Sequence, residues 1–268
     1  MVMKSLFTPV CGLLLCALVL DGCQKVRFPY PHPTGCQITG LKGEILGEDS
    51  VMISYNGKGN PISMTRTRVG TGAPNYFFRY DKRDRLTDII GAYSDNATFE
   101  TWHHYEYNDG NYSYLPRTDS VYLFGIIGNG PLPDSVFFGV RASDFTFDIY
   151  GRIIKVIETD VRPYPAVYTD LYYYNPQGNL VATSLTGTGG VDSVTYTSYD
   201  THTNPHRMHP IWQLIDRDYS INNRQAAVAY NSFGLPTIIG GKGSSGIFLG
   251  YYFSGELEID YTCGAERF

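Results

Sequence analysis

The sequence predicts an all-β protein, a curved antiparallel meander of repeated hairpins with one short helix. The 23 Tyr and 14 Phe favour strands, while the 29 Gly and 15 Pro supply turns for many short strands. One turn pattern recurs, mostly at intervals of about 25 to 31 residues, which is typical of repeat architectures. Near the C-terminus, acidic and apolar residues alternate as in a strand with one wet face. An open, partly closed or barrel-like sheet would fit this pattern.

The recurring turn is clearest at Tyr174–Leu180. An aromatic residue is followed by Asp or Asn, two free positions, a turn residue, a polar residue and an apolar residue. The Asp or Asn side chain can bond backbone groups two residues on, and Gly four residues after the aromatic permits positive φ. We therefore predict a hairpin at each copy. Asp84 and Thr203 replace the turn Gly, so distorted hairpins are expected there. The other copies are Tyr55–Ile62, Tyr80–Leu86, Phe147–Ile153, the looser Tyr199–Pro205 and Tyr230–Pro236, and a degenerate copy at Tyr107–Tyr112.

A second recurring element is Asp-Ser-Val followed by apolar or aromatic residues. It indicates the start of a strand. The copies are Asp49–Val51, Asp119–Val121, Asp134–Val136 and Asp192–Val194.

The chain begins with an expected lipoprotein signal peptide at residues 1–22. Its apolar run, from Leu13 to Leu20, is shorter than the roughly 20 residues of a membrane-spanning helix. Gly22 and Cys23 fit a bacterial lipobox, in which Cys23 receives a lipid, although Asp21 departs from the usual small or apolar residue. A secreted protein and an uncleaved anchor are the alternatives.

Three further segments follow the signal. Residues 23–35 are expected to form a tether, because Pro29, Pro31 and Pro33 prevent regular pairing. Residues 36–263 form one expected β domain, and residues 264–268 a C-terminal tail.

Cys36 and Cys263 are the cysteines left once Cys11, Cys16 and Cys23 are assigned to the signal and the lipid site. They lie on the first and last expected strands. In an oxidising compartment we expect them to form a disulfide that closes nearly the whole domain. Two unrelated buried thiols are the alternative.

The stretch 206–223 breaks the repeat. Its apolar residues, from Ile211 to Ile215, have helical spacing, which predicts a short helix or 3₁₀ turn. His202, His206 and His209 could bind a transition metal, but their spacing fits no tetrahedral pattern and favours a polar loop. The adjacent His103 and His104 should point to opposite faces of a strand.

The last strand carries Glu256, Glu258 and Asp260 on one face. Paired carboxylates can hydrolyse glycosides, but an alternating acidic face is usually just solvated and also protects a sheet edge. Tyr173 and Tyr252 are expected to point outward by strand parity, where exposed rings could stack on sugars or contact a partner. A net charge of −5 argues against nucleic acid, and no motif implies a cofactor or metal.

The Tyr-Asp-x-x-Gly-Arg pattern resembles the YD repeats of Rhs-type proteins, which build long antiparallel sheets. More closely, the lipobox, the Cys36-to-Cys263 span, Tyr199-Asp200 with Asn204-Pro205, the Ser220–Asn223 segment and the final Tyr261-Thr262-Cys263 resemble the YD-repeat lipoproteins of Bacteroidetes-type bacteria, the DUF4595-like group. The resemblance covers nearly all of the mature chain. It implies an architecture and no catalytic residues.

These observations lead us to expect a non-enzymatic lipoprotein of the cell envelope, anchored in the outer membrane through Cys23. Its sheet would bind a glycan, a peptide or an envelope protein. The alternative is a glycan-acting hydrolase with acidic residues on a concave face. A cleft with converging acids of raised pKa would favour this alternative.

Overall fold

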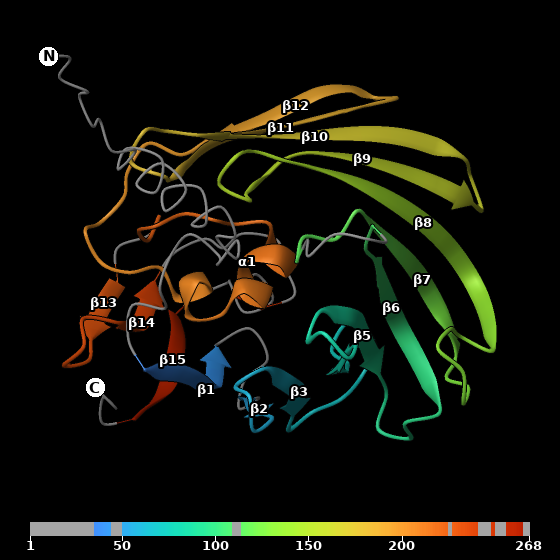
Figure 1. Ribbon diagram of the computed structural model, residues 1–268, viewed down its shortest axis with the longest axis horizontal. Coiled ribbons are helices and arrows are strands. Elements are labelled where there is room, and N and C mark those ends of the chain that lie inside the picture. The colour runs from blue at the N-terminus through green and yellow to red at the C-terminus, as the bar shows by residue number, and fades with distance from the viewer. Residues whose placement is uncertain are drawn as a thin grey trace, which may run out of the picture. The chain divides into compact units, whose positions relative to one another are not determined.

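The computed structural model describes residues 35–43, 50–108, 114–224, 227–240, 248–249 and 256–264. All of these belong to one compact unit, His32–Phe268. The described residues form a single antiparallel sheet of 15 strands, which confirms the all-β prediction (Figure 1). The strands are β1 (Cys36–Gly43), β2 (Ser50–Tyr55), β3 (Pro61–Arg66), β4 (Asn75–Tyr80), β5 (Leu86–Ala92), β6 (Thr98–Glu106), β7 (Thr118–Ile126), β8 (Ser135–Phe147), β9 (Ile153–Arg162), β10 (Ala166–Tyr174), β11 (Leu180–Gly187), β12 (Gly190–Thr195), β13 (Ala227–Tyr230), β14 (Pro236–Gly240) and β15 (Glu256–Cys263).

The predicted hairpin turns share one set of hydrogen bonds. In the copy at Tyr80–Leu86, the Asp81 N–H donates to the Arg85 carbonyl at 2.9 Å, while Arg83 and Arg85 N–H groups donate to Asp81 Oδ1. Asp84 adopts φ 60° in the glycine position and preserves these bonds, so the expected distortion is absent. The corresponding glycines also have positive φ; they are Gly59, Gly151, Gly178 and Gly234.

Several tyrosines of the pattern, and Tyr261 of β15, donate a hydrogen bond to a neighbouring strand. The hydroxyl of Tyr80 donates to the carbonyl of Pro61, the first residue of β3, at 2.6 Å. The pattern predicted aromatic residues at these positions, and their role as donors emerges only when the strands are paired. The equivalent bonds run from Tyr55 to Ile38, Tyr107 to Leu86, Tyr199 to Leu180 and Tyr261 to Pro236.

The sheet is a meander only from β1 to β12. The last three strands join the opposite side of β1, in the order β1-β15-β14-β13, so β12 and β13 are the two end strands and the sheet is not closed. Cys36 lies directly opposite Cys263 across the β1–β15 pair, and the predicted disulfide joins them.

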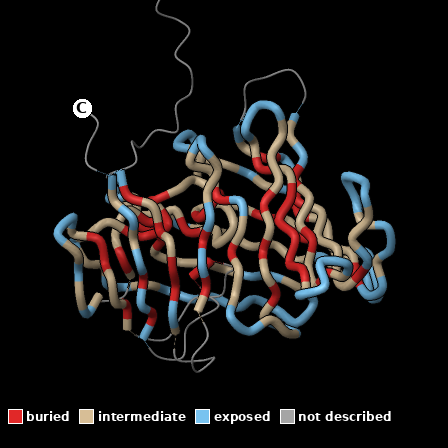
Figure 2. The backbone as a smooth tube through the Cα atoms, turned by 90° about the horizontal axis from the view of Figure 1, so that it is seen from below, coloured by how far each residue is buried: buried red, intermediate tan, exposed pale blue. Residues whose placement is uncertain are grey.

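Between β12 and β13 the chain forms an insert, residues 204–222, that contains the predicted helical segment. It comprises the 3₁₀ helix η2 (Pro205–Met208) and the helix α1 (Pro210–Asp216). Trp212 is fully buried, stacks on Phe248 at 4.1 Å and meets Phe78 of β4 edge-on. The insert therefore belongs to the main hydrophobic core, with residues from β1–β6, β14 and β15 around it. Figure 2 shows buried residues along the strands and exposed residues at the turns.

The insert overturns one predicted hairpin, that at Tyr199–Pro205. The Asp200 N–H donates to the carbonyl of Asn223, and the N–H of Asn223 donates back to Asp200 Oδ1 at 3.0 Å. Asn223 thus occupies the place that Arg85 holds relative to Asp81. The hairpin is lost because the hydrogen bonds of Asp200 require only an N–H and a carbonyl at the right distance, and Asn223 supplies both. The insert therefore lies between the two ends of the turn.

Two of the four Asp-Ser-Val copies lead into the start of a strand, as predicted, since Ser50 and Ser135 are the first residues of β2 and β8. The other two copies lie inside β7 and β12, which begin before them. Among the described helices, none combines the length and apolar character needed to cross a membrane.

Candidate functional site

A network of ion pairs joins the insert to strands β8–β10. Arg217 follows α1 in the left-handed conformation, with φ 53°. Its Nη2 donates to Glu158 Oε1 at 2.8 Å, and its Nη1 donates to Asp170 Oδ2 at 3.1 Å. Burial opposes ionisation of Arg217, but the nearby Tyr172 and Glu158 raise its pKa above the usual value. The cation is therefore firmly held on the inner face of the sheet.

Arg141 of β8 extends the network toward solvent. It donates to Glu158 Oε2 at 3.0 Å and to both carboxylate oxygens of Asp160, at 2.6 and 3.3 Å. The hydrogen bond to Asp160 is the main cause that raises the pKa of the Arg141 guanidinium. The two arginines and the three acids, Glu158, Asp160 and Asp170, nearly balance in charge.

Asp170 is the acid of this network that is best suited to act as a catalytic group. Burial, followed by the charge of Glu158, raises the pKa of its carboxyl above the usual value. A carboxyl with a raised pKa can act as a general acid. Glu158 and Asp160 have both oxygens bound to arginine, however, so the network leaves no second free carboxylate at this point for a paired mechanism.

His103 and His104 lie with different partners, consistent with the prediction of opposite faces. His104 Nδ1 is 2.8 Å from Asp88 Oδ1, which also accepts from the buried Trp102 indole at 2.9 Å. The bond to Asp88 raises the pKa of His104. His103 Nδ1 lies 2.8 Å from Asp119 Oδ2.

The three histidines considered for metal binding have separate roles. His206 is buried between Asn204 and Asp216, at 2.9 and 2.8 Å, and His202 stacks on the ring of Tyr230 at 3.9 Å. His209 accepts from the Ile211 N–H at the start of α1. The described part of the chain contains no group of three or more metal-ligating side chains.

The acidic residues of β15 point to solvent. Glu256, Glu258 and Asp260 are exposed, while the intervening Leu257 and Ile259 are buried. Asp260 pairs with Lys42 of β1 at 3.3 Å, and both side chains are more than half exposed. The structure thus has the wet face that alternation predicted.

Tyr173 points away from the core, as strand parity predicted, and is 48% exposed. Tyr252 and Cys23 lie outside the described residues. The Asp-Gly turn predicted after Tyr107 also falls there, at residues 109–113, although β6 and β7 on its two sides pair as a hairpin requires.

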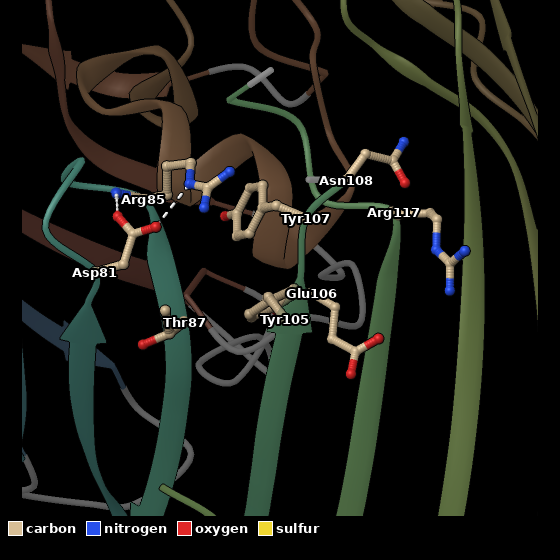
Figure 3. A pocket seen from close by; sticks show the side chains of 8 residues that line it. All are labelled: Asp81, Arg85, Thr87, Tyr105, Glu106, Tyr107, Asn108 and Arg117. Atoms are coloured by element: carbon tan, nitrogen blue, oxygen red, sulfur yellow. Dashed lines mark hydrogen bonds and ion pairs between the residues drawn. The ribbon is translucent and has the colours of Figure 1, made fainter. Parts of the chain in front are cut away.

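A polar hollow of about 490 Å³ opens beside the start of β5 and the end of β6 (Figure 3). Arg85 is bound through its Nε to Asp81 and lies over the Tyr107 ring at 4.3 Å. Opposite charges again balance across the hollow. It is lined by Asp81, Arg85, Thr87, Tyr105, Glu106, Tyr107, Asn108 and Arg117.

Sequence reasoning missed an exposed aromatic site, the β8 bulge, which comprises Phe137 and Phe138 opposite Phe124 of β7. Phe137 and Phe138 are 65% and 59% exposed. The signal was available: two adjacent Phe stand in a segment, residues 120–140, whose single charged residue is Asp134. The Asp-Ser-Val element at Asp134–Val136 runs directly into this pair, but that element predicts only the start of a strand.

No protein-family model and no curated protein matches the chain. Among solved structures, it is similar to a TcdB2-TccC3-Cdc42 structure, with 13% identity, 73% of this chain covered and a TM-score of 0.31. A TcdB2-TccC3 structure matches with 12% identity, 72% coverage and a TM-score of 0.30. The chain spans 10% of the length of those chains. Such TM-scores do not establish a shared fold, and the YD-repeat-like character of the sheet rests on its own recurring turns.

Proposed function

We propose that this chain is a non-enzymatic lipoprotein of the cell envelope, which uses its sheet surface to bind a glycan, a peptide or a partner protein. The observation that supports this proposal is the exposure of large rings on the strands, at Tyr173, Phe137 and Phe138. These rings add little to the core, and exposed aromatic residues often dominate binding interfaces. Membership of the Bacteroidetes-type, DUF4595-like YD-repeat lipoproteins is part of the same proposal.

The second candidate is a glycan-acting hydrolase. Its support is the raised pKa of Asp170, close to Glu158 on the inner face. We rank it second because arginines occupy both oxygens of the neighbouring Glu158 and Asp160.

A paired screen separates the two candidates. The domain without its signal and lipid site is tested for binding to glycans and envelope proteins, and for hydrolysis of the same glycans. We expect binding that Tyr173→Ala or Phe138→Ala weakens, without turnover. Turnover abolished by Asp170→Asn would establish the hydrolase instead. Turnover abolished by Glu256→Gln or Glu258→Gln would do the same and would place the acids on β15.

The proposed outer-membrane anchor has its own test. Labelled palmitate should enter the wild-type protein and should not enter Cys23→Ala. Equal labelling of both would reject the anchor and leave the binding role of the sheet to the screen above.

A further inference from the structure

The start of β8 has an open backbone edge. β7 pairs with β8 from Ser135 onward, whereas pairing with β9 begins only at Val140, opposite Arg162. On this side, Arg162 Nη2 donates to the Val136 carbonyl at 3.4 Å. Gly139 is buried beside the Arg162 carbonyl, so the open stretch of edge is Ser135–Phe138, which offers backbone donors and acceptors to another strand.

The β8 bulge lies in this stretch. The register passes from Leu123↔Gly139 to Gly125↔Val136, so that Phe137 and Phe138 together oppose the single residue Phe124. Bulges commonly re-aim side chains next to functional sites. Here the bulge directs aromatic rings toward solvent at an open edge.

The backbone of Phe124 is strained. Its φ is 51°, a conformation rare for a bulky residue, and its ring meets Phe138 edge-on at 6.3 Å. The neighbouring Gly125 has no room for a Cβ, which would lie 2.0 Å from the Ser135 carbonyl oxygen. The packing therefore keeps Phe124 in its strained conformation beside exposed aromatic rings. Backbone strain of this kind is concentrated at binding and active sites.

Few charged residues surround the bulge, and Arg162, whose side chain reaches the Val136 carbonyl, is one of them. Asp134 is the single charged residue in 120–140, and the nearby residues 163–169 contain none. Tyr164 and Val167 in that second segment are 83% and 55% exposed. An uncharged, apolar partner suits this surface, and a polyanion or a charged peptide does not.

We propose that the β8 bulge docks an extended, uncharged, apolar segment of a partner protein, which adds to the sheet as a strand beside Ser135–Phe138. The proposal rests on the binding function above and names its partner class. Only an extended polypeptide supplies both the alternating donors and acceptors of a strand and side chains to pack on Phe137 and Phe138. A second copy of the chain fits less well, because its own bulge would interrupt the regular spacing of the bonds.

The probe is a set of uncharged ten-residue peptides that alternate Val and Thr around a central Phe, tested with the full chain. We expect binding, and slower hydrogen exchange at residues 136–138. The double variant Phe137→Ser/Phe138→Ser should weaken binding by at least about tenfold. Peptides N-methylated at alternate residues should lose binding to a similar extent, since they lack the donors. Ile149→Ser, at a 92% exposed position in a turn, is the matched control and should bind normally.

Each other outcome has a definite meaning. Equal binding by the Phe137→Ser/Phe138→Ser variant with an unchanged melting temperature, or equal binding of N-methylated peptides, would overturn the proposal. A wild-type dimer that this variant converts to monomer would replace the partner with a second copy. Glycan binding that depends on Tyr173, without peptide binding, would overturn this inference and leave the proposed function intact. Failure of both peptide and glycan or protein binding would reject the two together.

Discussion

Two kinds of hydrogen bond recur in the repeats, one inside the turn and, in the copies that begin with Tyr55, Tyr80, Tyr107 and Tyr199, one from the tyrosine to a neighbouring strand. The Asp or Asn of the turn satisfies N–H groups that the tight backbone leaves unpaired, as Asp148 does for Tyr150 and Arg152 at 2.9 and 3.0 Å. The tyrosine hydroxyls then bind a carbonyl at the start of the adjacent strand. Because both bonds depend on individual side chains, substitutions at single residues can separate their contributions.

The turn glycines provide the first comparison, between Gly151→Ala and Gly178→Ala. Both have positive φ, at 75° and 85°, so each alanine should cost about 1 to 2 kcal/mol for the left-handed conformation. A Cβ at Gly178 would also lie 2.7 Å from Ile221 Cδ1, whereas the nearest atom to one at Gly151 is 3.7 Å away. We expect the Gly178 variant to lose more stability in urea unfolding. The reverse order would contradict the packing of the insert against this turn.

The tyrosine hydroxyls provide the second comparison, between Tyr80→Phe and Tyr174→Phe. Tyr80 donates to the Pro61 carbonyl at 2.6 Å, while the buried hydroxyl of Tyr174 has no partner among the described residues. Tyr80→Phe should cost about 1 kcal/mol because it removes a made hydrogen bond, and Tyr174→Phe should be neutral or stabilising. Thermal unfolding measures both. Equal losses would show that ring packing, and not the hydroxyl, stabilises these positions.

Among the elements of secondary structure, the insert and the turn that holds it differ most from expectation. The hairpins were predictable because the hydrogen bonds of a turn such as that of Asp148 join residues no more than four positions apart. The residues of one turn therefore appear together in the sequence. The closure of Asp200 by Asn223 was not, since the two are 23 residues apart and meet where the ends of the insert pair, at Thr203↔Asn222. The helical periodicity from Ile211 to Ile215 still indicated α1.

Asp200→Ala should release the insert. Asp200 accepts from the N–H groups of His202 and Asn223 and from the Asn223 side chain, and these bonds close a long excursion of the chain. We expect faster tryptic cleavage after Arg207 and Arg217 in this variant. Asp81→Ala breaks an ordinary four-residue turn and is the matched control. If both variants are cleaved in the insert at the wild-type rate, the hydrogen bonds of Asp200 do not hold the insert in place.

At the scale of the whole molecule, the order of the strands determines which contacts connect the two parts of the sheet. The chain builds β1 to β12 in sequence and then returns, so β13, β14 and β15 connect to the sheet through the β1–β15 pair. Sequence analysis could predict that Cys36 and Cys263 join the first and last strands, because composition and spacing identify both. It could not predict the return to β1, which depends on pairings such as Leu41↔Ile259 between residues far apart in the chain. The charged network of Arg217 was unpredictable for the same reason, since Glu158 and Asp170 meet it only after the insert has folded against the sheet.

Removal of the disulfide should therefore loosen one part of the sheet before the rest. Cys36 and Cys263 are 227 residues apart, and a cross-link over such a loop stabilises a fold by about 5 kcal/mol on the chain-entropy model. The double variant Cys36→Ser/Cys263→Ser should melt at a lower temperature than the wild type. Because β15 is the link between β1 and the pair β13–β14, its amide protons should lose protection from hydrogen exchange before those of β4 to β9.

Addition of a reductant to the wild type should reproduce both effects and should leave the double variant unchanged. Simultaneous loss of protection in all strands would mean that the sheet opens as one cooperative unit, in which the β1–β15 pair is no weaker than its neighbours.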